Sequence, residues 1–483
     1  MSLSQKSLLG LSWNFVQQMA TQISLFVHYL VMSRLFSPKE YGIVAMLWVF
    51  TGFAELLKDL GINVLLIQEK ENTAKTISTI FWANIGIGFL LSALFWLFSP
   101  LIAAFYNTPI LAEITKYYAC YFLISAFYGV PIILLEKKLS FKKLFFLQFS
   151  ALFISLIFSV FFAIYGYGIW SILVQPLLQA ILLNVFVWIT AEWYPIFVWK
   201  KQEFLSLQKK ALPILGGNLL AYSTRNIDNL LIGKYFDEAT LGNYARAYSL
   251  MQMPFQLING IIIRVMLPSF ALIQEDISRL RNLYLRMIAL LALCVFPISV
   301  GMMLVSDKLI LLLFGEKWEG VVPILQILSL VGAIQSVISP VGLIYFTCQK
   351  NKLFLKNNLI TSGIAIICMG IGIFISVKMV AFMIGFSSLI SLVIHISAIG
   401  KLIDFSVSAW IKNLIPTILC TILMGICVFL VGKIAFSQVF IFALKVFTGI
   451  VSYVICLHIG RVAAYKELKE MLISRIYLKA RKE

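Results

Sequence analysis

The sequence predicts an all-α integral membrane protein with about fourteen transmembrane helices, and three observations support this prediction. Hydrophobic residues make up 61% of the 483 residues and charged residues only 12%, whereas soluble domains carry about 25% charged residues. Fourteen segments are long and apolar enough to cross a bilayer, which takes about 20 residues each. Lysine and arginine gather in alternate connections between these segments, which is typical of membrane proteins.

The fourteen apolar segments follow one another along the whole chain, with short connections between them. We expect them at residues 9–33, 41–60, 77–99, 115–135, 144–165, 168–190, 211–235, 241–265, 283–305, 320–346, 354–377, 379–400, 412–433 and 438–459. Two of the breaks are the weakest in hydropathy. One lies at Tyr165-Gly166-Tyr167-Gly168 and the other at residues 376–379.

Basic residues indicate which ends of the segments face the cytoplasm. With the N-terminus placed inside, 28 of the 39 lysines and arginines fall on the inner side, 8 fall on the outer side and 3 lie within segments. This excess follows the positive-inside rule, with both termini in the cytoplasm. Both termini can lie on one side only if the number of spans is even, which agrees with fourteen.

Composition also excludes several classes of function. The net charge of +18 comes from basic residues dispersed over the inner connections, where anionic lipid headgroups attract them. We therefore expect anionic lipids as partners and no nucleic acid. The seven cysteines form no Cys-x-x-Cys pair and there are three scattered histidines, so the sequence predicts no metal site and no cofactor. A Walker A motif is absent, which argues against direct use of ATP.

One pattern occurs twice in the chain, offset by 200 residues. The stretch Ser33-Arg34-Leu35-Phe36-Ser37-Pro38-Lys39-Glu40-Tyr41-Gly42 aligns with Gly233-Lys234-Tyr235-Phe236-Asp237-Glu238-Ala239-Thr240-Leu241-Gly242, and His28 falls on Asp228. Two halves with one plan are typical of transporters with a central site. The layout we predict is a first lobe at 1–190, a cytoplasmic amphipathic linker at 191–210, a second lobe at 211–400, two further helices at 401–460 and a basic cytoplasmic tail at 461–483. The linker and the tail could each form one amphipathic helix.

Polar side chains recur at helical spacing on three of the segments. The first segment carries Asn14, Gln17, Gln18, Thr21, Gln22 and His28; the seventh carries Asn218, Tyr222, Arg225, Asp228 and Asn229; the eighth carries Arg246, Gln252, Gln256 and Asn259. Such side chains either hold helices together by hydrogen bonds or line a water-filled cavity. The second reading predicts a cavity between the two halves, in which His28 and Asp228 face each other.

The ionisable residues within the segments also have two readings each. Arg225 and Asp228 are one turn apart, so they either neutralise each other or bind an anionic group of a ligand. Arg246 either extends to the outer interface or belongs to the site, and Lys445 is more simply explained by packing or extension to the interface. His28 is either a packing residue or a proton-sensitive contact. Glu55 lies near Lys58 and Asp59 at a helix end, where solvation explains it.

Several stretches of the chain resemble the polysaccharide flippases of the MOP exporter superfamily, the Wzx-like group that includes O-antigen, colanic acid and teichuronic acid exporters. The first stretch is Trp13-Asn14 followed by Ser33 to Gly42, and the second is Asp59-Leu60-Gly61-Ile62 followed by Leu66-Ile67-Gln68. The third is Arg225-Asn226-Ile227-Asp228 through Leu231-Ile232-Gly233, followed by Leu241-Gly242-Asn243-Tyr244 and Ala247-Tyr248. A weaker fourth is Phe314-Gly315-Glu316-Lys317-Trp318. The resemblance covers essentially the whole chain. It implies a V-shaped, MATE-like fold of two six-helix lobes plus two C-terminal helices, in a bacterial inner membrane.

The resemblance also implies an activity, which is translocation of an undecaprenyl-pyrophosphate-linked oligosaccharide from the inner to the outer leaflet by alternating access. It implies no enzymatic step, and a polysaccharide polymerase and glycosyltransferases of the same pathway as partners. The alternatives within the superfamily are a peptidoglycan-precursor flippase and a drug or cation antiporter. A membrane polysaccharide polymerase or ligase is the alternative from another class, and it is disfavoured because the chain has no large outer loop.

Overall fold

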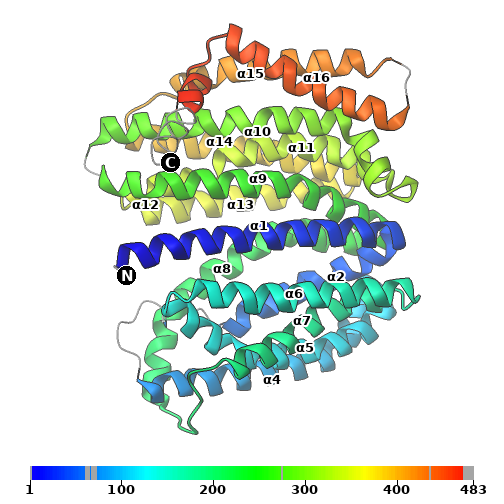
Figure 1. The fold of residues 1–483 in the computed structure, drawn as a ribbon, viewed down its shortest axis with the longest axis vertical. Helices are drawn as coiled ribbons and strands as arrows, with labels where there is room; N and C mark the ends of the chain where they lie inside the picture. Colours follow the sequence, from blue (N-terminus) through cyan, green and yellow to red (C-terminus); the bar gives the residue numbers. More distant parts are fainter. Residues whose placement is uncertain (1–2, 60–65, 67–72, 274–275, 435–436, 471–483) are drawn as a thin grey trace, which may run out of the picture. The chain divides into compact units, whose positions relative to one another are not determined.

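The computed structural model describes residues 3–59, 66, 73–273, 276–434 and 437–470, all of them helical or in short connections (Figure 1). The helices of the first half are α1 (Leu3–Leu35), α2 (Pro38–Asp59), α4 (Ala74–Tyr106), α5 (Ile110–Lys137), α6 (Phe141–Ile164), α7 (Trp170–Ile189) and α8 (Lys201–Tyr235). Those that follow are α9 (Glu238–Leu272), α10 (Ile277–Leu313), the short 3₁₀ helix η1 (Glu316–Trp318), α11 (Val321–Ile338), α12 (Val341–Thr347), α13 (Asn351–Ile373), α14 (Val377–Leu402), α15 (Val407–Val431) and α16 (Gln438–Ile459).

Both of the weakest predicted breaks are confirmed. Between α6 and α7 the chain turns through Gly166 and Gly168, whose φ angles of 82° and 55° suit glycine best. Before α14, the Ser376 side chain accepts a hydrogen bond from the Met379 amide at 3.1 Å, which is a standard way to begin a helix. The predicted segment 320–346 forms α11 and α12 in succession, with Pro340 at the break.

Eleven helices of the described chain are long and apolar enough to cross a membrane, so the protein is a multi-pass membrane protein. The three long helices that fall short of this criterion are α1, α8 and α9. These three correspond to the first, seventh and eighth predicted segments, which carry the polar side chains. Their low hydropathy therefore reflects the polar faces that the sequence analysis singled out, and the total of fourteen spans stays a prediction.

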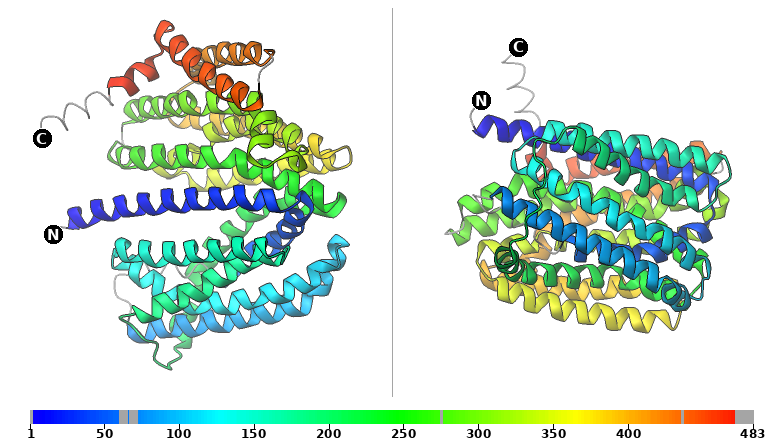
Figure 2. Two further views of the ribbon diagram at one scale, coloured as in Figure 1. Left: turned by 45° about the vertical axis from the view of Figure 1, so that its right-hand side comes forward. Right: turned by 90° about the horizontal axis from the view of Figure 1, so that it is seen from below.

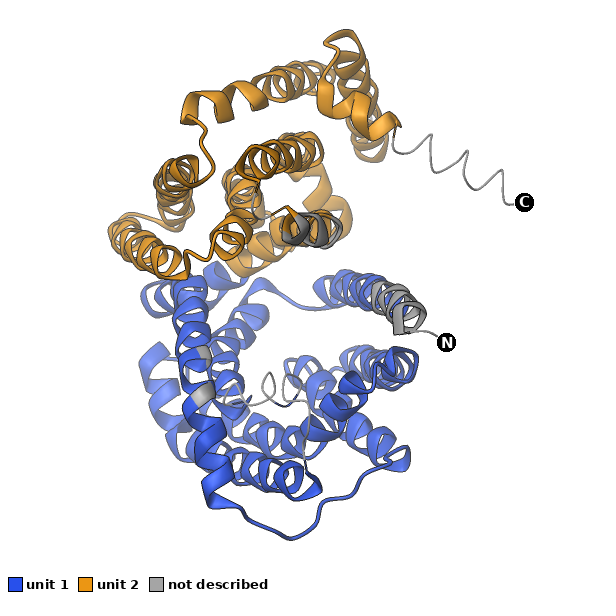
Figure 3. Cartoon of the chain, turned by 90° about the vertical axis from the view of Figure 1, so that its left-hand side faces the viewer, with its two compact units in different colours: residues 1–242 blue, residues 243–483 orange. Residues whose placement is uncertain are grey.

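The chain divides into two compact units, Met1–Gly242 and Asn243–Glu483 (Figure 3). Helix α8 belongs to the first unit, where it packs against α2 and α4. This division differs from the predicted lobe boundaries at residues 190 and 211, because α8 was expected to open the second lobe. The predicted layout, with a first lobe at 1–190, a linker at 191–210 and a second lobe at 211–400, stays a prediction.

The first unit shows the 200-residue repeat directly in its helix ends. Helix α1 ends at Leu35 and α8 at Tyr235, while α2 begins at Pro38 and α9 at Glu238. A side-chain carboxylate bonds the start of the second helix in each pair, between equivalent positions but in opposite directions. In the first copy the Ser37 amide donates to Glu40 Oε2 at 2.8 Å, and in the second copy Asp237 Oδ1 accepts from the Thr240 amide at 3.1 Å.

Two equivalent glycines make a reciprocal close contact in the same unit. A Cβ atom on Gly42 would lie 1.7 Å from the Glu238 carbonyl oxygen, and one on Gly242 would lie 1.9 Å from the Pro38 carbonyl oxygen. Each glycine therefore packs against the backbone that begins the other helix. Small residues allow this close approach of helix backbones in membrane proteins, which explains why glycine occupies both positions of the repeat.

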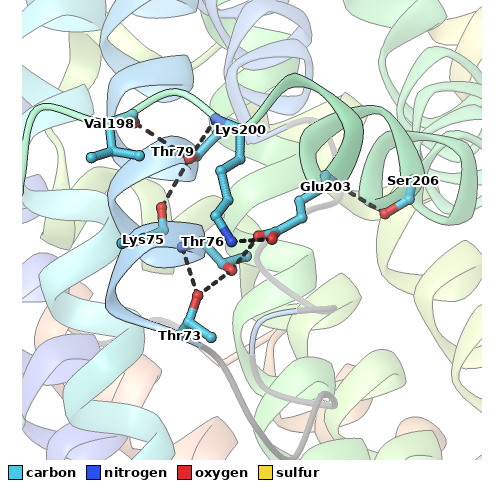
Figure 4. A network of polar contacts seen from close by, with 8 residues as sticks. All are labelled: Thr73, Lys75, Thr76, Thr79, Val198, Lys200, Glu203 and Ser206. Atoms are coloured by element: carbon cyan, nitrogen blue, oxygen red, sulfur yellow. Dashed lines mark hydrogen bonds and ion pairs between the residues drawn. The ribbon is translucent and has the colours of Figure 1, made fainter.

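Residues 191–200 form an extended strap that lies along the start of α4, rather than the predicted amphipathic helix (Figures 2 and 4). Trp82 Nε1 donates to the Ile196 carbonyl at 3.0 Å, and the Ile196 amide donates to Ser78 Oγ at 3.0 Å. The Lys200 amide donates to Thr79 Oγ1 at 3.2 Å. Two hydroxyls and one indole of α4 thus bond backbone groups of the strap, and the helix starts only at Lys201.

The start of α8 is anchored to the start of α4 by side chains (Figure 4). Thr76 Oγ1 donates to Glu203 Oε2 at 2.5 Å, and Lys200 pairs with the same carboxylate. In the strap itself, Glu192 pairs with Lys138 at 2.6 Å and with Lys143 at 3.7 Å. The hydrogen bond from Lys138, together with the charges of both lysines, lowers the pKa of Glu192.

The second unit has a continuous apolar core in which α10 packs against α11, α15 and α16. Lys445 of α16 is buried, donates to the Leu304 carbonyl at 3.0 Å and lies 3.7 Å from Asp307. The structure thus assigns Lys445 to packing on α10. Residues 463–470 of the predicted tail are helical, and Glu467 pairs with Arg286 of α10; the tail from 471 lies outside the described residues.

Candidate functional site

Helix α8 presents polar and charged side chains on an exposed face within the first unit. Asn218 and Arg225 are exposed. Tyr222 lies between them in sequence and attaches the helix to α2, because its hydroxyl lies 3.1 Å from the carbonyl oxygens of both Trp48 and Val49. A guanidinium in the middle of a helix at membrane depth is costly unless it faces water or a polar ligand. The exposure of Arg225 is therefore the clearest sign of function on α8.

Asp228 has a different environment from Arg225, although the two are one turn apart. Only 3% of Asp228 is exposed, and its Oδ1 accepts a hydrogen bond from the Asn229 amide at 2.7 Å. The structure records no ion pair between Arg225 and Asp228 among the residues that it describes. The two readings of this pair therefore both stay predictions. Asn229 is half-buried, and its Oδ1 has no hydrogen-bond partner within the described part of the chain.

The polar face of α1 packs against α6. Gln17 donates a hydrogen bond to Gln148, and His28 Nε2 lies 3.1 Å from Ser159 Oγ. His28 is 8% exposed, which supports its reading as a packing histidine. Gln18 and Gln22 are half-buried, and the side chain of Asn14 lies outside the described residues. The predicted approach of His28 to Asp228 stays a prediction.

Arg246 is buried among aromatic rings of the second unit. Its guanidinium carbon lies 5.5 Å from the ring centre of Phe314 and 5.3 Å from that of Trp318, and only 6% of the residue is exposed. Both of its readings, extension to the outer interface and membership of the site, stay predictions. The motif from Phe314 to Trp318 thus supplies a cation–π cradle. Gln256 on the same helix is exposed, and its Nε2 donates a hydrogen bond to Gln252 Oε1 at 2.5 Å.

The first unit contains a cavity that was not predicted from the sequence. The cavity is about 350 Å³ in volume and lies among α2, α4 and α5. It is lined by the charged residues Glu55, Lys58, Asp59 and Glu136, the polar residues Asn84, Tyr121, Ser125 and Tyr128, and the apolar positions Ala126, Gly129, Ile132 and Ile133. Glu55 and Asp59 stand one turn apart on α2, and this spacing is the signal that could have revealed it. Solvation at a helix end, which the sequence suggests for Glu55, is therefore not the whole explanation of this residue.

Comparison with known proteins identifies the family. Residues 31–323 match the family described as "Polysaccharide biosynthesis protein". The chain is 28% identical to the teichuronic acid biosynthesis protein TuaB of Bacillus subtilis (strain 168), over 98% of this chain and 99% of that protein. It is 26% identical to the lipopolysaccharide biosynthesis protein WzxC of Escherichia coli (strain K12), over 77% of this chain and 76% of that protein.

Two solved structures share the fold. The inward closed conformation of the lipid II flippase MurJ superposes with a TM-score of 0.77 at 17% identity, covering 94% of this chain and 98% of that one. An inward-facing multidrug resistance MATE family transporter of the MOP superfamily superposes with a TM-score of 0.64 at 12% identity, over 81% of this chain and 96% of that one. The chain therefore has the MOP fold and belongs to the polysaccharide biosynthesis protein family.

Proposed function

We propose that this protein is a flippase that moves an undecaprenyl-pyrophosphate-linked oligosaccharide from the inner to the outer leaflet of the bacterial plasma membrane, for surface polysaccharide biosynthesis. Relatives that are named for teichuronic acid, lipopolysaccharide and succinoglycan biosynthesis support this proposal, as does the fold shared with a lipid II flippase. The observation that carries it in this chain is the exposure of Arg225 in the middle of α8.

The chemistry of that guanidinium suits the substrate. A pyrophosphate cannot cross hydrocarbon without compensation of its charge, and arginine binds phosphate oxygens through paired, charge-assisted hydrogen bonds. Exposed amides such as Asn218 on α8 and Gln256 on α9 can pair with sugar hydroxyls. Arg246 is packed under aromatic rings, so we assign the headgroup contact to Arg225. The prenyl tail stays in lipid, and the headgroup crosses by alternating access.

The proposed orientation places both termini in the cytoplasm, with fourteen spans. The charge distribution supports it, because 28 of the 39 basic residues then lie inside. Cysteines at Asn107 and Glu316 should react with an impermeant reagent from outside, whereas cysteines at Lys142 and Lys352 should react only after permeabilisation. Labelling at position 142 in intact cells would contradict this orientation. Anionic lipids and the polymerase and glycosyltransferases of the pathway are the partners we propose.

The function is tested by complementation of a strain that lacks its own polysaccharide flippase. The chain should restore surface glycan, and Arg225→Ala should abolish the rescue while the protein remains in the membrane at the wild-type amount. Tyr235→Phe, at an exposed position of the same helix, serves as the control and should rescue fully. Normal export by Arg225→Ala would show that the headgroup is not bound by this residue.

A further inference from the structure

The cavity among α2, α4 and α5 has features that suit a ligand. Asn84 of α4 is one of its lining residues, only 5% of this residue is exposed, and its Oδ1 has no hydrogen-bond partner within the described chain. A buried amide oxygen without a partner costs free energy. Such an atom beside an open cavity is explained if a ligand donates a hydrogen bond to it.

The other polar groups of the cavity supply both acceptors and donors. Glu55 and Glu136 are half-buried, and the structure records no hydrogen bond or ion pair for the side-chain carboxylate of either residue in the part of the chain that it describes. Lys58 is fixed at the cavity, because its ammonium donates to Ser125 Oγ at 2.9 Å and lies 5.8 Å from the ring centre of Tyr121. The cavity therefore offers carboxylate and amide oxygens at separate positions, beside one held ammonium group.

These features distinguish between classes of ligand. A metal ion needs oxygens that converge on one point, and no group of three acidic, histidine or cysteine residues in the described chain is placed to hold one. An anionic ligand is disfavoured, because the cavity is lined by the three acidic residues Glu55, Asp59 and Glu136 and by only one basic residue, Lys58. A quaternary ammonium ion would favour the aromatic rings, but the Lys58 ammonium already lies over Tyr121.

We propose that this cavity binds one uncharged sugar ring, a hexose or N-acetylhexosamine, of the translocated oligosaccharide. The inference rests on the proposed function and deepens it. Sugar hydroxyls both donate and accept hydrogen bonds, so the Asn84 amide oxygen and the Glu55 carboxylate accept from neighbouring hydroxyls and Lys58 donates to a ring or hydroxyl oxygen. The volume of about 350 Å³ lies near the lower end of ligand sites, which span about 300–1,000 Å³, and suits one ring rather than a chain.

Binding can be measured on the full chain in lipid nanodiscs, without translocation, by saturation-transfer NMR titrations. The probes are methyl β-D-glucopyranoside and N-acetylglucosamine as uncharged sugars, glucuronate as an acidic sugar and tetramethylammonium as a cation. We expect saturation transfer to one or both uncharged sugars and much weaker transfer to the two ions. Stronger binding of glucuronate or tetramethylammonium than of both uncharged sugars would overturn the proposal.

Two variants of cavity residues and one control variant test whether the sugar binds in this cavity. Asn84→Leu and Glu55→Gln should each weaken binding of the uncharged sugar about tenfold, because each removes or weakens one hydrogen bond to the ligand. Glu113→Gln, at an exposed position near the other end of α5, should bind as the wild type does. Glu55→Gln changes almost no volume and therefore keeps the test decisive if Asn84→Leu does not fold.

The outcomes also separate this proposal from the proposed function. Unchanged sugar binding in both cavity variants would overturn the sugar site, even if the chain exports glycan. Loss of sugar binding in Glu55→Gln, with wild-type binding in Glu113→Gln, would support the site even if the chain rescued no flippase-deficient strain. Failure to rescue a flippase-deficient strain would count against the proposed function alone.

Discussion

The two copies of the 200-residue repeat, α1–α2 and α8–α9, have the same backbone plan and different chemistry. Their helices end and begin at equivalent residues, and Gly42 and Gly242 make equivalent contacts. Their polar faces differ in what they contact. Gln17 and His28 of α1 bind side chains of α6, whereas Asn218 and Arg225 of α8 are exposed.

The difference shows that symmetry of sequence need not mean symmetry of function. With the 200-residue offset, Asn218 falls on Gln18 and Tyr222 falls on Gln22, but Arg225 falls on Leu25. The charge is therefore a feature of the second copy alone. Gln17 and His28 of the first copy hold α1 against α6, and we propose that the second copy uses its exposed face to contact the substrate.

The largest effect should come from the glycines, which both copies need. In Gly42→Ala and Gly242→Ala the new Cβ would overlap a backbone oxygen, and backbone cannot move aside as a flexible side chain can. Overpacking of this kind typically costs about 1–3 kcal/mol, so either variant should lose folded protein from the membrane. The measurement is the monodisperse fraction after extraction in mild detergent.

Gly216→Ala on α8 is the matched control for the glycine variants. A Cβ at this position meets nothing within 4 Å, and alanine favours helix over glycine by up to about 1 kcal/mol. We expect its thermal stability to equal or exceed that of the wild type. If Gly42→Ala and Gly242→Ala behaved like this control, the close contact between the beginnings of α2 and α9 would be refuted.

A smaller effect should distinguish the two polar faces. Gln17→Leu should lower the thermal stability through loss of its hydrogen bond to Gln148 on α6. A double-mutant cycle with Gln148→Leu should give a coupling of about 0.6 kcal/mol, as is typical of hydrogen bonds between membrane helices. Asn218→Leu on α8 should leave the thermal stability unchanged, because Asn218 is exposed. Additive effects of the two glutamine changes would contradict the assigned role of α1.

The smallest effect concerns the anchor at the start of α8. Hydrogen bonds from Lys200 and Thr76 lower the pKa of Glu203 from its usual 4.5. A lowered pKa in the folded state contributes stability at pH values above the unfolded pKa, and this contribution is lost as the pH falls through the folded pKa. The Tm difference between wild type and Glu203→Gln should therefore be constant from pH 7 to about pH 5 and shrink at lower pH. A difference that grew on acidification would rule out this anchor.

Most of the fold could be predicted from the sequence, because hydropathy and turn residues act locally. Gly166, Gly168 and Ser376 mark helix ends by their own backbone and side-chain preferences, and the structure confirms them. The strap at 191–200 could not be predicted, since its hydrogen bonds go to Ser78 and Thr79, more than a hundred residues away.

The candidate site was less predictable than the fold, since the sequence does not reveal how each helix is rotated. The same helical spacing of polar residues gave a packed face on α1 and an exposed face on α8. Arg246 was a candidate because it is charged, and only the structure shows that Phe314 and Trp318 cover it. The cavity around Asn84 was missed for the same reason, because its residues come from three helices and converge only in the fold.

The central claim is that the substrate's anionic headgroup contacts α8 and not α1. The most direct test is the binding of undecaprenyl pyrophosphate to the purified protein, measured by native mass spectrometry for Arg225→Leu and Gln22→Leu. Loss of charge-assisted hydrogen bonds, worth about 1.5–3 kcal/mol, should weaken binding at least about tenfold in Arg225→Leu, while Gln22→Leu should bind as the wild type does. Wild-type binding by Arg225→Leu, or an equal loss in Gln22→Leu, would contradict the account.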